Sequence, residues 1–353
     1  MLKLLTIDDK TEWNFYVTKS AEYDFYHTWH YHSLDTSGSP ILVVYIENEN
    51  HIAFPLIKRQ IPGTVYCDLT CVYGYTGPIS NKRMEQLEDS LMENFKVAFL
   101  ACLKAENCVS VFSRLHLFFK QPLLLERFGG IYDNGLSVVL DLSVSIEAQR
   151  KKYRRSTNDS IKRSWKKGFR LIEESGDDAI ALFFDVYKEN MERIGASDYY
   201  LFNEEYFKKI TNTDEYDARV FIVYDGDKVM ASTIVMLTNG IIEAHLLGTR
   251  TEYIHLSPFK FLVDEITVIG RSLGMRYYNL GGGLGYKQDT LFFGKLGLSD
   301  LTMDYKSWRF IVNPDIYQQL LDDRGIDKNL DVDFFPLYKY NQRVTVSSAG
   351  KEN

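Results

Sequence analysis

The sequence predicts a mixed α/β fold divided into two domains. Its 353 residues exceed the roughly 150 residues of an ordinary domain. The second half reads as three strands, a helix and one more strand, an order that gives a mixed sheet with helices on its faces. Residues 41–115 show a similar order, which indicates an ancient duplication of one fold. Hydrophobic residues make up 45% and charged residues 25%, a balance that excludes a disordered chain.

In the first half, β-branched and aromatic runs predict strands at 41–47 and 51–59, joined by a hairpin turn. Apolar residues at helical spacing predict a helix over 81–105. Buried strands are expected at 108–115 and 136–142.

In the second half, turn residues at 225–228 and 238–240 predict two hairpins. Ser257 and Pro258 suit the N-cap and the first position of a helix. The expected elements are strands at 169–174, 219–224, 229–237, 241–248 and 275–280, with helices near 177–193, 203–212 and 258–273.

Residues 150–170 differ from the rest of the chain in composition. They hold ten basic residues and one acid, Asp159, whereas the whole chain has a net charge of −7. Apolar residues recur every four positions, so one side of this segment packs while the rest is cationic. Contact with phosphates or another polyanion is one interpretation, and a solvated helix face is the other.

This change in composition places a domain boundary near residue 143. We expect an N-terminal domain over 1–143 and a C-terminal domain over 144–323. The tail, 324–353, is expected to pack on the core or to be partly disordered.

Charge and motifs exclude several classes of protein. The net charge of −7 argues against a wholly basic nucleic-acid coat. The chain has no HExxH, GxSxG or Walker A motif, so hydrolases, kinases and zinc enzymes have no support. The glycines of 281–285 (GGGLG) follow a strand but fail the GxGxxG spacing of a dinucleotide site.

Four cysteines are few for this length and form no CxxC pair, so we expect reduced thiols and no metal site. Acidic residues follow the N-terminus before a signal peptide could form. Apolar runs fall far short of the ~20 residues that a membrane span needs. These features predict a cytoplasmic protein without a membrane span.

Several polar residues are candidates for a site, each with a structural alternative. His245 shares a strand face with Glu243 and could act as a general base, or it is a core histidine. Arg114 and His116 end a strand, where α/β sheets bind ligands, although capping a loop would also explain them. The glycine run 281–283 would let a ligand approach the backbone closely.

Taken together, these segments resemble the Fem-like aminoacyltransferases of the GNAT N-acyltransferase superfamily, the branch that forms peptidoglycan bridges, and related GNAT-family acetyltransferases. The resemblance covers residues 23–300. The matching segments are 73–78 (YGYTGP), 112–116 (FSRLH), 153–157 (YRRST), 196–200 (ASDYY), 245–249 (HLLGT), 256–258 (LSP), 280–283 (LGGG) and 289–297 (DTLFFGKLG).

The resemblance implies two tandem GNAT-like domains, with the site in a groove between them and along splayed strands of the second, catalytic domain. Members transfer an acyl or aminoacyl group to an amine, which attacks the donor carbonyl directly. Backbone N–H groups of Leu246, Leu247 and Gly248 would hold the oxyanion, with Lys295 as a further donor.

Other roles implied by the resemblance fall into three sets. The candidates for the general base are His245, Glu243 and Asp289. The expected substrate contacts are Tyr73, Tyr75, Arg114, His116, Tyr199, Gly281, Gly282 and Gly283, and the expected donor-phosphate contacts are Arg154, Arg155, Lys162 and Ser257.

The sequence departs from the family in ways that leave the donor open. The glycine-rich pyrophosphate loop of acetyl-CoA enzymes is absent at 251–256, and Gly294 and Leu298 replace aromatic residues around Lys295. Acyl-CoA and aminoacyl-tRNA are both expected co-substrates, with no tightly bound cofactor. The expected acceptor is an amine of a cell-envelope precursor or an amino sugar. The alternative is a non-catalytic RNA-binding or scaffold protein that uses the basic helix at 150–170.

Overall fold

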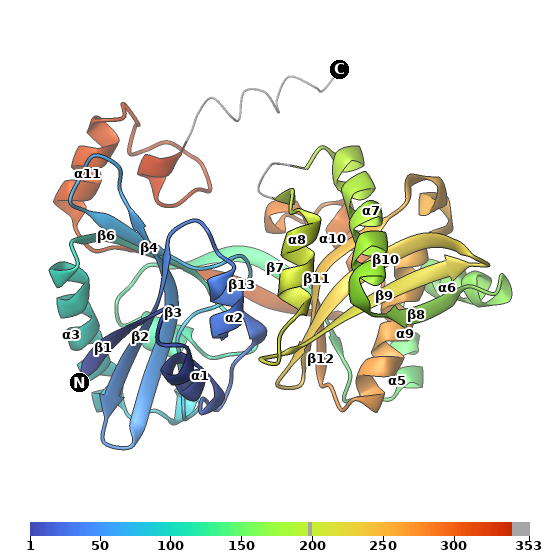
Figure 1. Ribbon diagram of the computed structural model, residues 1–353, viewed down its shortest axis with the longest axis horizontal. Coiled ribbons are helices and arrows are strands. Elements are labelled where there is room, and N and C mark those ends of the chain that lie inside the picture. Colours follow the sequence, from blue (N-terminus) through green and yellow to red (C-terminus); the bar gives the residue numbers. More distant parts are fainter. Residues whose placement is uncertain (197–199, 341–353) are drawn as a thin grey trace. The chain divides into compact units, whose positions relative to one another are not determined.

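The computed structural model describes residues 1–196 and 200–340 (Figure 1). The chain forms two compact units, and each is discontinuous in sequence. Unit 1 comprises Met1–Glu22, Asp35–Asp133 and Lys306–Asn353, and unit 2 comprises Tyr23–Leu34 and Asn134–Tyr305. Each unit is described by itself.

Unit 1 is built on a mixed sheet. Its strand order is β1 (Leu2–Thr6), β2 (Ser39–Glu47), β3 (Asn50–Gln60), β4 (Cys67–Thr70), β6 (Cys108–Arg114) and β13 (Leu301–Ile311), and the short β5 (Ile79–Ser80) also pairs with β3. β4 and β6 run parallel, and the other neighbours run antiparallel. Smaller elements are α1 (Lys10–Thr18), η2 (Met84–Gln86) and α4 (Pro122–Leu125).

Helices cover both faces of this sheet. α3 (Asp89–Ala105) buries Phe95 and Phe99, spaced four apart, in the core beside Cys108. Because side chains alternate along a strand, Val109 faces the other way. There it packs with α11 (Pro314–Asp322) and η6 (Leu337–Lys339).

Unit 2 repeats this plan. Its sheet has the order β7 (Ile131–Asp141), β12 (Tyr277–Gly281), β11 (Ile241–Thr249), β10 (Lys228–Thr238), β9 (Asp217–Asp225) and β8 (Arg170–Glu174). α9 (Pro258–Ser272) links the parallel strands β11 and β12, as α3 links β4 and β6 in unit 1. The order of three antiparallel strands, helix and parallel strand therefore occurs in both units, as the sequence predicts.

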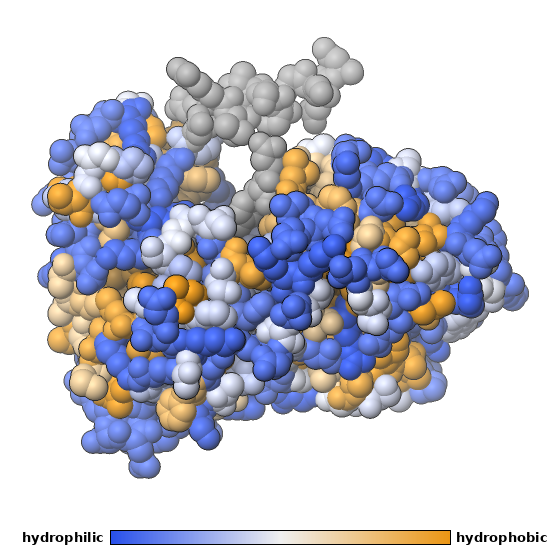
Figure 2. All heavy atoms as spheres, in the orientation of Figure 1, coloured by the Kyte–Doolittle hydropathy of each residue, from blue (hydrophilic) through white to orange (hydrophobic). Residues whose placement is uncertain are grey.

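The helices of unit 2 lie in two layers. α9 packs in the core with residues of α6 (Arg155–Lys166), and α5 (Ile146–Lys152) precedes α6. α7 (Gly176–Ile194) and α8 (Glu204–Thr211) pack against β9, β10 and β11. The face of α7 and α8 drawn in Figure 2 is mostly hydrophilic, in keeping with the ion pairs of Lys208 and Lys209.

Two strands carry the chain across the division between the units. β7 follows β6 along the chain but pairs with β12 of unit 2. β13 follows β12 but pairs with β6 of unit 1. The units thus exchange their final strands, which is why they differ from the contiguous domains expected at 1–143 and 144–323. That residues 1–143 and 144–323 act as separate functional units remains a prediction.

A short N-terminal segment, Tyr23–Leu34, also belongs to unit 2. It holds η1 (Phe25–His27) and α2 (Trp29–Ser33). Its His30 amide donates to Glu215 at 2.8 Å, and Asn239 donates to the Tyr23 carbonyl at 3.4 Å. From the sequence this segment is expected in the N-terminal domain, because pairing with distant residues leaves no local pattern.

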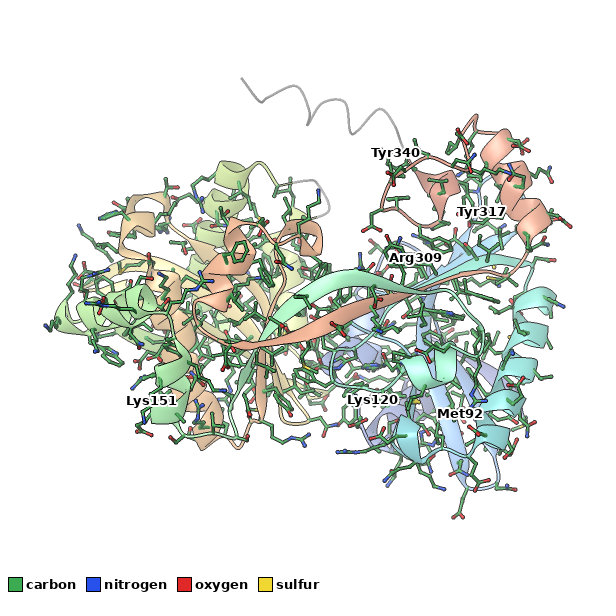
Figure 3. All side chains as sticks on the ribbon, turned by 180° about the vertical axis from the view of Figure 1, so that it is seen from behind. Met92, Lys120, Lys151, Arg309, Tyr317 and Tyr340 are labelled. Carbon is green, nitrogen blue, oxygen red and sulfur yellow. The ribbon has the colours of Figure 1, made fainter. Side chains whose placement is uncertain are left out.

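The segment after α11 packs on unit 1. Tyr338 is buried, and Tyr317 of α11, labelled in Figure 3, contacts its ring at 5.1 Å. The buried carboxylate of Asp68 accepts from Lys339 at 2.6 Å. The tail therefore packs on the core as far as Tyr340, and residues 341–353 lie outside the described residues. Within the described ranges, no helix is long and apolar enough to cross a membrane.

Candidate active site

β11 and β12 pair over three positions in unit 2 and then separate. The parallel register joins Ile241 to Tyr277 and ends with Glu243 opposite Asn279. β11 continues to Thr249, so its edge past Glu243 has no β12 partner among the described residues. An opening between parallel strands exposes backbone N–H and C=O groups to a ligand.

A β-bulge at His245 marks the point where the strands separate. On β10, Ile234 faces Leu246 and Val235 faces Ala244, so His245 is the extra residue. Bulges bend a strand and increase its twist, which carries the end of β11 away from β12. Leu246, Leu247 and Gly248, the predicted oxyanion donors, all lie beyond the bulge.

Gly248 allows α7 to approach β11 closely. A Cβ atom there would lie 2.8 Å from the Val186 carbonyl oxygen, so only glycine fits. Past β11, Glu189 of α7 accepts from the Thr251 amide at 2.8 Å and from Arg250 at 3.0 Å. These contacts fix the end of the opened strand on α7.

Glu243 lies buried at the base of the opening, in a polar network. Asn279 donates to its carboxylate at 2.8 Å. The Asn279 side-chain oxygen accepts from Ser137 at 2.8 Å and from the Gly281 amide at 3.0 Å. This network fixes the orientation of the Glu243 carboxyl group.

Asp24, from the N-terminal segment, is a charged neighbour of Glu243 within unit 2. Carboxylate oxygens of the two residues lie within 4.8 Å of each other, and both side chains are buried. Burial, and then the charge of Asp24, raise the pKa of Glu243 well above its usual range. A carboxyl group with a raised pKa is suited to proton transfer near neutral pH.

His245 is enclosed by aromatic rings of the same segment. Its ring lies 5.3 Å from Phe25 and 6.0 Å from Tyr31, both edge to face. Burial lowers the pKa of His245 to about 3, so the imidazole is neutral and weakly basic. Of the two predicted bases on β11, Glu243 is therefore the more suitable one.

The glycine run after β12 forms a tight loop against its own chain. A Cβ on Gly282 would lie 2.6 Å from Tyr286, and one on Gly283 would lie 2.3 Å from Asp289. At these two positions, protein atoms thus fill the space beside the glycine backbone where a ligand is expected from the sequence. Gly281 has φ 74°, which also favours glycine.

Asp289 and Lys295 lie on the helix that follows this loop, α10 (Thr290–Leu296). Asp289 is the N-cap, and its carboxylate accepts from the amides of Phe292 at 2.8 Å and Leu284 at 2.9 Å. The Phe292 bond and then the others lower the pKa of Asp289, which makes it a weak base.

Lys295 is 9% exposed, and its ammonium donates to the Gly282 carbonyl at 2.7 Å. Burial lowers the pKa of Lys295 to about 8, and the charge of Asp289 acts in the opposite direction. An ammonium carries three N–H donors, so two remain beyond the bond to Gly282. The amine is thus held at the loop that directly follows β12.

Part of the basic segment has a structural role. Arg150 forms a two-point ion pair with buried Asp264 of α9, at 3.0 and 2.7 Å. Lys152 pairs with Asp300 at 3.0 Å. Lys151, labelled in Figure 3, is exposed on α5. Composition alone could not separate the cations that hold α5 to α9 from those that stay exposed.

The predicted donor-phosphate residues lie along α6 and at the start of α9. Arg154 precedes α6, and its side chain donates to the Phe293 carbonyl at 3.2 Å. Arg155 has a 97% exposed side chain 3.9 Å from Asp159, and Lys162 is exposed. Ser257 precedes α9 with φ 53°, but its side chain makes no capping bond, unlike the expected N-cap.

The predicted substrate contacts Tyr73, Tyr75, Arg114 and His116 lie in unit 1. Gln121 organises this part of unit 1. It donates to the Thr76 carbonyl at 2.7 Å and accepts from the His116 amide at 2.8 Å. The remaining predicted contact, Tyr199, lies outside the described residues.

Sequence reasoning missed Asp24, Asn279 and Gln121. All three are buried, and Asn279 and Gln121 use their side chains to hold polar groups distant in sequence. Asn279 could have been found, because a polar residue inside the predicted strand 275–280 needs a buried partner. No local signal identifies Asp24 or Gln121.

Comparison with known proteins finds one family model that matches part of the second unit. Residues 148–288 match the family model described as an acetyltransferase (GNAT) domain. No curated protein matches the sequence.

Solved structures give the fold of the whole chain. FemX has a TM-score of 0.69 at 12% identity, over 90% of this chain and 99% of its own. L-PGS from Bacillus licheniformis has a TM-score of 0.56 at 15% identity, over 90% and 97%. The C-terminal domain of a putative lysylphosphatidylglycerol synthetase from Agrobacterium fabrum has a TM-score of 0.54 at 14% identity, over 90% and 95%. With the repeated order of elements in both units, the predicted tandem GNAT-like, Fem-like fold is confirmed.

Proposed function

Because residues 148–288 form a GNAT acyltransferase domain within a Fem-like fold, we propose that the protein transfers an acyl or aminoacyl group to an acceptor amine at the opening between β11 and β12. The observation that carries this proposal is the end of β-pairing at Glu243 and Asn279. The free edge of β11 offers backbone amides to a carbonyl oxygen.

In this reaction the amine nitrogen attacks the donor carbonyl carbon and forms a tetrahedral intermediate. Amides of Leu246, Leu247 or Gly248 hold the developing oxyanion, and the Lys295 ammonium supplies a further charge-assisted hydrogen bond. Collapse of the intermediate breaks the bond to the leaving thiolate or ester oxygen and leaves an amide. No covalent enzyme intermediate is needed, because holding the two reactants together supplies much of the rate.

Glu243 is the proposed general base. When ionised, its carboxylate takes the proton that the attacking nitrogen loses, directly or through water. The network with Asn279 orients the carboxylate, and Asp24 raises the pH at which it ionises. His245, enclosed by aromatic rings, fits better as a packing residue of the bulge.

The donor is proposed to be acyl-CoA or an aminoacyl-tRNA. FemX, L-PGS and the domain of a putative lysylphosphatidylglycerol synthetase share this fold, and the exposed cations of α6 suit an anionic carrier. We propose an envelope precursor or amino sugar as the acceptor. We also propose a cytoplasmic location, which the four free cysteines favour.

A transfer assay tests this function. The protein is mixed with a panel of acyl-CoA and aminoacyl-tRNA donors and with amino-sugar nucleotides, and the amide product is detected by mass spectrometry. We expect a product with one donor class, loss of that product in Lys295→Met, and full activity in the control Lys287→Met, whose side chain is exposed. No amide from any donor, or equal activity in both variants, would contradict the proposal.

A further inference from the structure

The turn after β11 has its polar groups occupied by protein side chains. Asn190 accepts from the Thr249 amide at 3.3 Å, and Glu189 accepts from the Thr251 amide at 2.8 Å. The Arg250 amide donates to the Met230 carbonyl at 2.9 Å. The bonds from Thr251, and then the bond and charge of Arg250, lower the pKa of Glu189. Its ionised carboxylate, paired with Arg250, therefore occupies the Thr251 amide that a phosphate would need.

A group of cations lies instead where α6 meets α9. Arg154 lies just before α6 and is anchored on α10 and the residue after it, because its amide donates to the Gly297 carbonyl at 3.0 Å and its guanidinium to the Phe293 carbonyl at 3.2 Å. Arg163 is exposed on α6, and half-buried Lys260 lies in the first turn of α9. α6 and α9 pack directly on each other.

These three cations have no acidic partner within 4.0 Å among the described residues. Carboxylates on the adjoining elements are engaged elsewhere: Asp264 with Arg150, Glu265 with Trp165 and Asp300 with Lys152. Burial, then Arg163 and Arg154, lower the pKa of Lys260, as expected for like charges brought together without an anion. Uncompensated cations at fixed positions favour a bound anion.

We infer that Arg154, Arg163 and Lys260 form a binding site for phosphate groups of the acyl donor, at the junction of α6 and α9 and not at the turn after β11. The inference rests on the proposed function and makes it more specific. Of the donor-phosphate residues expected from the sequence, it keeps Arg154 and adds Arg163 of α6 and Lys260 of α9, the helix that packs on α6.

Binding measurements on the full chain test this site without requiring turnover. Inorganic pyrophosphate, CoA and an RNA hairpin with an acceptor-stem sequence are titrated by calorimetry at fixed low salt. We expect Arg163→Gln and Lys260→Gln each to weaken binding of pyrophosphate about tenfold. The control Lys166→Gln removes an exposed charge from the same helix and should change binding less than twofold.

Binding of CoA and of the RNA hairpin distinguishes the two possible sources of the phosphate groups. If the site variants bind CoA about tenfold more weakly but bind the RNA as the wild type does, the site holds a CoA donor. If they lose affinity for the RNA but not for CoA, the site holds a tRNA donor. Equal losses in Lys166→Gln and the two site variants would overturn the site, because a diffuse positive field would then explain binding. Unchanged binding in both site variants, with thermal unfolding unaltered, would overturn it as well.

Failure of the site and failure of the proposed function give different results. If an amide forms and both site variants keep the donor KM of the wild type, the function stands and the site is wrong. If the site variants lose phosphate binding but the wild type transfers no acyl group in the panel, the site stands and the function is wrong.

Discussion

Replacing Lys295 with methionine should raise stability while it removes activity. The residue is 9% exposed, and burial lowers the pKa of its ammonium from 10.5 to about 8. At about 1.4 kcal/mol for each pKa unit, keeping this side chain charged costs the folded state about 3 kcal/mol at neutral pH. The bond to the Gly282 carbonyl returns about 1 kcal/mol, and methionine has a similar volume. We therefore expect a net gain of about 2 kcal/mol in the free energy of unfolding.

The pH dependence of this difference has a defined sign. Between the folded pKa of about 8 and the unfolded value of 10.5, the unfolded chain binds more protons at Lys295, so wild-type stability rises with pH relative to the variant. The penalty from the buried charge, about 3 kcal/mol at pH 7, falls to about 1 kcal/mol near pH 10. The advantage of Lys295→Met should shrink by the same amount.

Urea unfolding of both proteins at pH 7 and pH 10 measures this difference, and the transfer assay measures activity in the same samples. Lys287→Met, whose side chain is exposed, controls for loss of a positive charge. A variant that is less stable than the wild type at both pH values, by an equal amount, would refute the reasoning. Lys295 would then be a structural residue, and burial of its charge would not lower the free energy of unfolding.

Three further predictions concern other parts of the molecule. Asp24→Asn removes the charge that helps to raise the pKa of Glu243, so the acidic limb of the pH–rate profile should move to lower pH; an unmoved limb would exclude this coupling. Gln121→Ala leaves the Thr76 and Pro78 carbonyls and the His116 amide without their partner, and should lower the free energy of unfolding by about 3 kcal/mol; a loss below about 0.5 kcal/mol in urea would contradict this. Gly248→Ala places a Cβ 2.8 Å from the Val186 carbonyl and should cost about 1–3 kcal/mol, which thermal unfolding would show; an unchanged midpoint would mean that α7 can shift freely.

Local patterns in the sequence were sufficient for most of the secondary structure. The hairpin at 225–228 appears between β9 and β10, because Asp-Gly turns act on neighbouring residues alone. The helix expected over 81–105 is shorter, with η2 followed by α3 from Asp89. The apolar residues before Asp89 are buried without continuing the helix, and spacing cannot distinguish these two cases.

The sequence by itself also determined the repeated order of elements, the cationic segment and the position of Lys295 after the glycine run. Each of these depends on residues close together along the chain. Only the tertiary structure decided that β7 and β13 are exchanged between the units, that Asp24 lies beside Glu243, and that Arg150 is held by Asp264. Such pairings join residues more than a hundred positions apart, and their free energy comes from burial and charge in the folded state, which leaves no periodic pattern in the sequence.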